Sequence, residues 1–260
     1  MTLALSGYLD QAWSYAARVL ERVQNPRDLP ALGAALVIAC EVAILRGDMD
    51  ALLRVNGAMG QLGQAEDMRI FQMLGAANQD YVQAIQPGNE GYAQVMQSTP
   101  GSDHVRAGLE KVRRTIAVLE ASGMQPGLRQ WLLHLAEVCL KARQVAEGLD
   151  ATLRALDLEN SEGGLDLARI FRLRGELLLR QDPPNRSAAE ADFAQALEIA
   201  RSQGAKTLEL GAAISLARLW QIEQPAAACT LLKETLAWFT EGWETPVLQE
   251  AQGLRDQLVC

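Results

Sequence analysis

The feature that most limits the fold of this chain is a series of small and large residues on one face of a helix. The stretch AEADFAQALEIA places Ala189 and Ala196 on either side of Phe193 at helical spacing. Small side chains let two helix backbones approach closely, and a large ring fills the groove beside them. The series therefore predicts a helix that packs tightly against a neighbour.

Related series recur along the chain in two forms. One form starts with a small residue and continues with residues four and seven positions later, as in Ala12–Ala16–Val19, Ala51–Val55–Ala58, Gly108–Val112–Thr115, Gly148–Thr152–Ala155 and Ala228–Leu232–Thr235. The other form has its small residue in the middle and occurs in the preceding segments, as in Ala35–Ala39–Val42, Leu132–Ala136–Cys139, Phe171–Gly175–Leu178 and Ala213–Ala217–Trp220. A four-helix bundle does not require small residues at matched places, whereas stacked helix pairs do.

The two forms alternate with a period of roughly 34 to 42 residues, which matches the signature of tetratricopeptide repeats. Ala, Leu, Gln, Glu and Arg dominate the composition and favour helices over strands. Short breaks rich in Gly, Pro, Asn and Asp separate helices of about 15 residues, which makes successive helices antiparallel. We therefore expect an all-α, right-handed α–α superhelix of roughly five to six helix pairs.

The expected organisation is a single repeat domain over residues 1–260. Residues 1–85 form its N-terminal repeats, and the opening MTLALSGYLDQAW has room for only the last turn of a first helix. Residues 86–104 interrupt the pattern with Gly, Pro, Ser and Asn and are expected to be an inserted loop or irregular segment. Residues 105–260 form the C-terminal repeats. An incomplete first pair would expose Leu3, Leu5 and Trp13, and a homodimer would cover them.

The charge and the apolar segments exclude several classes of partner. A formal net charge of -8 argues against nucleic-acid binding, which needs clustered Lys and Arg. The most apolar run, Leu29 to Leu45, is interrupted by Glu41 and is short for a membrane span, so we expect a buried helix there. We expect a cytoplasmic protein without membrane contact.

Chemical motifs are sparse. The sequence contains no phosphate-binding loop, dinucleotide fingerprint or nucleophile elbow. The cysteines are scattered at Cys40, Cys139, Cys229 and Cys260 without a C-x-x-C pair. A zinc site would also need histidines near them, and His104 and His134 are the only two. We therefore expect reduced, buried thiols, no catalytic residue, no cofactor and no metal.

The wall formed by the first helix of each pair is the remaining candidate site, because such helices line the concave surface of a repeat solenoid. These polar groups are suited to an extended peptide or to an acidic ligand group. The alternative is that Arg172 and Glu176 form a hydrated surface pair four residues apart and that the others are merely solvated. Counting from the small residues places six polar side chains on this wall: Glu137, Arg169, Arg172, Glu176, Arg218 and Gln221.

Three segments in the last third of the chain carry a family resemblance. They are ARIFRLRGELLLR, AEADFAQALEIARSQGAKTLELGAAISLARLW and WFTEGWETPVLQEA, which together lie between Ala168 and Ala251. They resemble the C-terminal tetratricopeptide region of large bacterial signalling proteins that join a class III adenylate or guanylate cyclase-like domain, or a DNA-binding domain, to an AAA-type ATPase. The stretches GYLDQAWSYAARVL and AGLEKVRRTIAVLEASG extend the resemblance upstream.

The resemblance implies a non-catalytic regulatory region that contacts a partner protein or an attached ATPase or cyclase domain. Neither the cyclase catalytic segment nor the ATPase phosphate loop occurs in this sequence, so no catalytic residue is carried over. Two alternatives remain at this stage. One is a small-molecule-sensing region of an ATPase-type transcriptional regulator, and the other is a free-standing tetratricopeptide adaptor.

Overall fold

The computed structural model describes residues 1–22, 29–65, 103–123, 125–159, 164 and 166–258, and all the regular structure in these ranges is helical. This confirms the expected all-α class. The expected insertion at 86–104 lies outside the described residues except for its last two positions, which begin helix α7 (Asp103–Ser122). None of the described helices is both long and apolar enough to cross a membrane.

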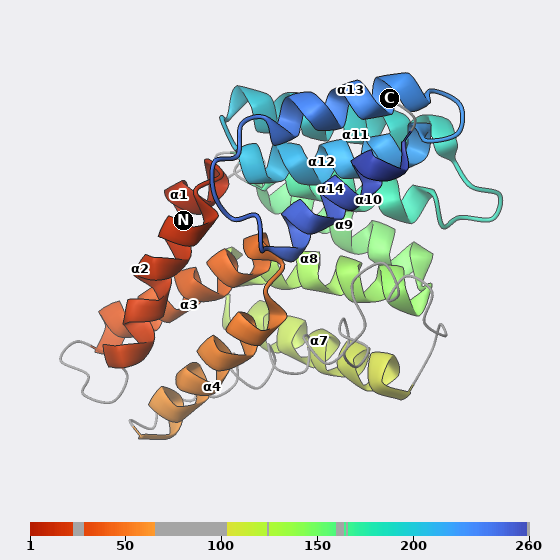
Figure 1. Cartoon of the computed structure of the whole chain (residues 1–260). Helices are drawn as coiled ribbons and strands as arrows, with labels where there is room; N and C mark the ends of the chain where they lie inside the picture. The colour runs from red at the N-terminus through yellow and green to blue at the C-terminus, as the bar shows by residue number, and fades with distance from the viewer. Residues whose placement is uncertain (23–28, 66–102, 124, 160–163, 165, 259–260) are drawn as a thin grey trace.

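The C-terminal helices stack in chain order (Figure 1). Each helix packs on the next one along the chain, and α10 also packs on both α8 and α12, while α12 also packs on α14. We call α8, α10, α12 and α14 the inner layer. The bounds are α8 Gln125–Ala142, α9 Val145–Glu159, α10 Leu167–Leu178, α11 Arg186–Ser202, α12 Lys206–Trp220, α13 Pro225–Leu236 and α14 Pro246–Gln257.

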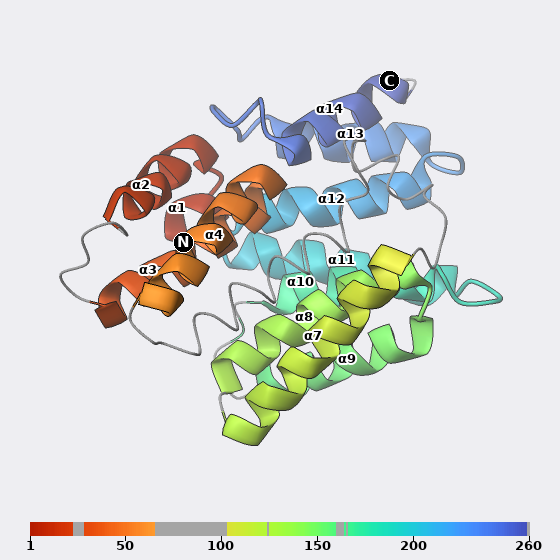
Figure 2. The same ribbon diagram turned by 90° about the horizontal axis from the view of Figure 1, so that it is seen from below.

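Four helices at the start of the chain form what we call the arm: α1 (Thr2–Leu5), α2 (Leu9–Arg22), α3 (Leu29–Arg46) and α4 (Met49–Ala65). Helix α3 packs between α2 and α4. Figures 1 and 2 both place the arm at one side of the stack. Helix α1 has only 4 residues.

The small residues lie where the helices approach most closely. Ala189, Phe193 and Ala196 are each fully buried in α11. A Cβ atom built on Gly175 of α10 would lie 2.5 Å from Cε1 of Phe193 and 3.1 Å from the carbonyl oxygen of Ala189. Gly148 of α9 is equally tight, because its Cβ would lie 2.7 Å from Cδ2 of Leu177. A side chain larger than hydrogen fits at these two contacts only if the facing side chains or the helices shift.

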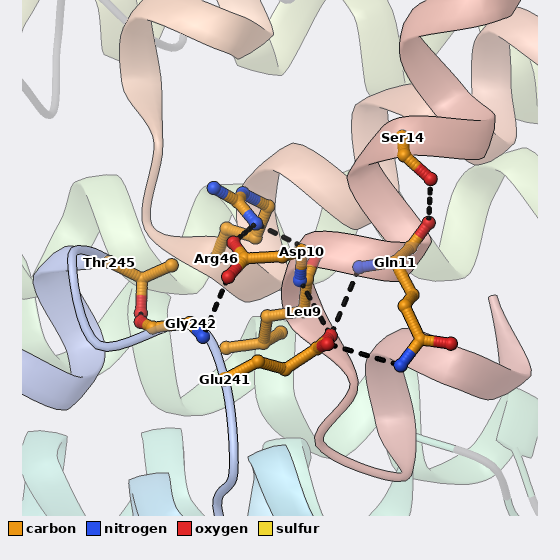
Figure 3. A network of polar contacts seen from close by, with 8 residues as sticks. All are labelled: Leu9, Asp10, Gln11, Ser14, Arg46, Glu241, Gly242 and Thr245. Atoms are coloured by element: carbon orange, nitrogen blue, oxygen red, sulfur yellow. Dashed lines mark hydrogen bonds and ion pairs between the residues drawn. The ribbon is translucent and has the colours of Figure 1, made fainter.

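The arm meets the C-terminal end of the chain at a set of polar contacts that we call the clamp (Figure 3). The carboxylate of Glu241 accepts hydrogen bonds from the backbone N–H groups of Asp10 and Gln11, each at 3.0 Å, and so caps the N-terminus of α2 from 231 and 230 residues away. Asp10 in turn accepts from the backbone N–H of Gly242 at 2.8 Å. Arg46 of α3 donates to Asp10 at 2.9 Å and to the carbonyl oxygen of Leu9 at 2.7 Å.

Further contacts cover the beginning of the chain beside the clamp. Trp238 donates its indole N–H to the carbonyl oxygen of Ser6, and the hydroxyl of Thr207 donates to the carbonyl oxygen of Ala4. Leu3 and Trp13 are half-buried and pack against the core. The apolar residues that were expected to be exposed at the incomplete first helix pair are thus partly covered by other parts of the same chain. The homodimer remains a prediction.

The expectation of reduced thiols is wrong for Cys229, which is disulfide-bonded, whereas Cys40 and Cys139 are free and buried. The error has a physical reason. Separation along the sequence does not measure separation in space, and α14 folds back to pack against α13, the helix that carries Cys229. Burial also raises the pKa values of the Cys40 and Cys139 thiols far above their ordinary value.

The close contact at Gly175 gives a prediction for stability. Gly175→Ala should destabilise the fold, because overpacking costs about 1–3 kcal/mol and exceeds the gain of about 0.5–1 kcal/mol from better helix propensity. Gly253→Ala in α14 is the matched control, since its Cβ would meet nothing within 4 Å and only the gain remains. Urea unfolding of both variants measures the difference. If Gly175→Ala is as stable as Gly253→Ala, α10 and α11 do not approach as closely as described.

Candidate functional site

Five of the six predicted wall residues lie on the inner layer, and four of them make polar contacts to a neighbouring inner helix. Arg169 of α10 donates to Glu137 of α8 at 3.2 Å. Glu176 of α10 accepts from the hydroxyl of Ser215 on α12 at 2.7 Å. Arg218 of α12 forms an ion pair with Glu250 of α14. The last of the five, Arg172, lies against Gly211 of α12, where a Cβ atom would be 3.6 Å from its Cδ and Nε atoms.

We call this series the inner row: Glu137, Arg169, Arg172, Glu176, Ser215, Arg218 and Glu250. No ion pair joins Arg172 to Glu176, both of which the structure describes. The surface pair of the alternative interpretation is therefore absent, and Glu176 instead accepts a hydrogen bond from Ser215 of the next inner helix. Gln221 is exposed at the C-cap of α12, and none of the polar contacts described for the inner row includes it. The repeat pattern thus indicated which residues face the inner layer, but it did not indicate that their contacts run from one helix to the next.

The contacts repeat with the helices. Glu137–Arg169 and Arg218–Glu250 each join residues 32 positions apart on neighbouring inner helices. Two ion pairs between α7 and α9, Arg113–Glu147 and Arg154–Glu120, each span 34 positions. Equal spacings of this kind arise when one helix pair is repeated in the same orientation.

Two residues outside the six predicted ones complete the site. Glu250 is the partner of Arg218, and Glu41 of the arm lies with its Oε2 atom 3.8 Å from Nη1 of Arg169. Periodicity within the stack could have suggested Glu250. It follows Arg218 by 32 positions, the same separation that places Arg169 after Glu137. Nothing local to α3 indicates that Glu41 meets α10.

Arg169 is the most enclosed cation of the inner row, with its residue only 6% exposed. Besides Glu41 and Glu137, the buried His134 lies nearby, with its Nδ1 atom 3.9 Å from Oε2 of Glu137. Burial lowers the pKa of His134, so its neutral form is favoured. A neutral histidine leaves the two carboxylates to neutralise Arg169.

A second arginine on α8 extends this charged region. Arg129 contacts Glu159 at 2.9 Å and Asp166 at 3.0 Å. Asp166 immediately precedes α10, and its backbone N–H donates to Glu159 at 2.8 Å. The region around Arg169 therefore combines buried carboxylates and guanidinium groups from α3, α8, α9 and the start of α10. In the part of the chain that the structure describes, no three His, Cys, Asp or Glu side chains are placed to bind a metal ion.

Burial dominates the acidity of two carboxylates in this region. It raises the pKa of Glu41 to about 7, although Arg169 and Arg129 oppose the shift, and Asp166 and Glu137 add to it. It also raises the pKa of Glu250 above its ordinary value, against the attraction of Arg218 and Arg172. In both cases the loss of solvent contact raises the pKa by more than the nearby positive charges lower it.

Comparison with models of protein families gives no match for the chain, and comparison with curated protein sequences gives no match either.

The raised pKa of Glu41 gives a prediction for pH dependence. A group whose pKa is higher in the folded chain than in the unfolded chain stabilises the fold fully below the unfolded pKa, near 4.5, and this contribution is lost as the pH rises through about 7. Glu41→Gln mimics the protonated form. The parent therefore loses stability between pH 5 and pH 8 that the variant keeps. The free energy of unfolding of the variant minus that of the parent should increase over this range by on the order of 1–3 kcal/mol.

Urea unfolding at intervals over this pH range measures the difference. Glu21→Gln, at an exposed position in α2, is the control and should show no such trend. A difference between Glu41→Gln and the parent that does not change with pH would show that Glu41 is solvated, and that α3 does not place it against Arg169.

Proposed function

We propose that this chain is a non-catalytic interaction and regulatory region that binds a partner protein or a neighbouring domain through its inner layer. The observation that carries the proposal is the inner row, in which four successive inner helices present polar groups at repeated positions. Arg172 is half-buried and the Arg218 side chain is 33% exposed, so both guanidinium groups reach solvent. An extended peptide that crosses the layer could contact these two groups, one on α10 and one on α12.

The proposal includes a finer fold assignment, a right-handed tetratricopeptide-like superhelix. The repeated spacings of 32 and 34 positions between paired charges support it, as do the small residues at matched places in α9 and α10. Each helix pair in such a stack leaves an apolar face open, and its neighbours cover it. The first helices of the pairs then share one surface, which suits a partner longer than one repeat.

The regulatory part of the proposal follows the resemblance to the C-terminal region of cyclase- and ATPase-type signalling proteins. A partner that binds one curvature of the stack more tightly than another favours that curvature. Partner binding is then coupled to the conformation of any domain attached to the stack, and the strength of this coupling is a free energy. The size of the coupling is limited by the difference between the partner's affinities for the two curvatures.

A charge reversal tests the inner row. The variant Arg172→Glu/Arg218→Glu should lose the partner that the parent captures, because two exposed guanidinium groups are replaced by carboxylates on the binding surface. The measurement is quantitative mass spectrometry after capture with the full chain from a lysate of the source organism. Lys233→Glu on α13, which is exposed and outside the inner layer, is the control for a general effect of added negative charge.

A second variant separates binding from folding. Arg218→Glu leaves two carboxylates facing each other at Glu250, so Arg218→Glu/Glu250→Arg restores an ion pair in the reversed orientation. The exchanged pair should fold like the parent and still bind the partner less well. If both charge-altered variants fold and capture the same proteins in the same amounts as the parent, the inner row is not the binding surface.

A further inference from the structure

The arm covers the most enclosed part of the inner row. Glu41 of α3 reaches Arg169 at 3.8 Å, and the exposed residues Val37 and Ile38 precede it on the same helix. The carboxylate of Glu41 thus stands where an acceptor group of a bound partner would stand if it used Arg169. This arrangement resembles a surface occupied by a segment of its own chain.

The clamp and the Glu41 contact depend on the same helix. Arg46 in the last turn of α3 belongs to the clamp, and Glu41 lies about 7.5 Å before it along the helix axis. A helix is stiff over this length, so a displacement of α3 that separates one contact also separates the other. The two contacts are therefore coupled mechanically.

The contact at Arg169 is a weak attachment. A charge that loses solvent is stabilised only when its partner is close and well oriented, and 3.8 Å is longer than a charge-assisted hydrogen bond. Burial also favours protonation of Glu41, with Arg169 and Arg129 opposing it and Asp166 and Glu137 supporting it. The clamp joins the start of α2 to the connection between α13 and α14 through three bonds of 2.8–3.0 Å, and it is the stronger polar attachment of the arm.

We propose that the arm is an autoinhibitory element, docked over Arg169 by the clamp, that must move before a partner can use this part of the inner row. This inference rests on the proposed function. Clamp opening is the first step of this movement, and the close approaches of Gly7 to Phe239 and of Leu9 to Gly242 are released with it. Residues that join the clamp therefore control access to Arg169 without contacting it.

Labelling with phenylglyoxal, which reacts with exposed guanidinium groups, tests the proposal in the full chain. Glu241→Lys replaces the cap of α2 with a positive charge at the positive end of the helix dipole and should open the clamp. The rate of modification at Arg169, measured by peptide mass spectrometry, should rise several-fold. Glu241→Ala removes the cap without adding repulsion and should give a smaller rise. Glu244→Lys, at an exposed position in the same connection, should give none.

Two arginines serve as internal references in each sample. Arg174 lies on the same helix as Arg169 but pairs with Asp192 of α11 at 2.6 Å, so it reports unfolding of α10 and should stay protected. Arg114 is exposed on α7 and should react equally in all variants. Circular dichroism confirms that the helical content is kept.

Unchanged labelling of Arg169 in folded Glu241→Lys would overturn the proposal, whether or not the first turn of α2 exchanges its amide hydrogens faster. A rise at Arg174 equal to that at Arg169 would also overturn it, since α10 would then be unfolding. Failure of the proposed function has a different signature, because it would appear as unchanged partner capture by the Arg172 and Arg218 variants.

Discussion

The arrangement of the stack depends on the close approach of neighbouring helix backbones at small residues. At Gly175 the hydrogen of glycine is the only side chain that leaves room for the ring of Phe193 and the backbone of Ala189. Gly148 plays the same part for Leu177. Because cores are packed as densely as organic crystals, contacts of this kind allow one separation and one orientation of the helices. The position of every side chain on the inner layer follows from that geometry.

Fixed helix positions explain why charged groups far apart in the sequence meet at regular offsets. Glu137 reaches Arg169, and Arg218 reaches Glu250, because α8 and α10, like α12 and α14, are neighbours in the inner layer. The offset repeats, but the order of the charges is reversed. A stack can therefore keep its geometry while its surface chemistry changes from one helix to the next.

The parts of the structure that could be predicted from the sequence are those that depend on residues within one helix pair. Burial of Ala189, Phe193 and Ala196 follows from a local pattern, as does the placement of Glu137 and Arg218 on one layer. Contacts between distant segments could not be predicted, because no local pattern encodes them. Glu241 capping α2 is one example, and Glu41 facing Arg169 is another. The inner layer was thus predictable, whereas its partial cover was not.

The kind of contact that attaches the arm bears on its proposed role. An apolar interface gains free energy in proportion to the area it removes from water, and it responds little to the charge of a competitor. The arm has contacts of both kinds. Ala4 and Leu9 are fully buried, whereas the clamp consists largely of hydrogen bonds to the start of α2, which water or a charged group can replace at small net cost. Arg169 gains a second carboxylate from Glu41, yet it keeps Glu137 when the arm leaves. Release therefore leaves Arg169 paired, which is one of the conditions under which an arm can dock reversibly.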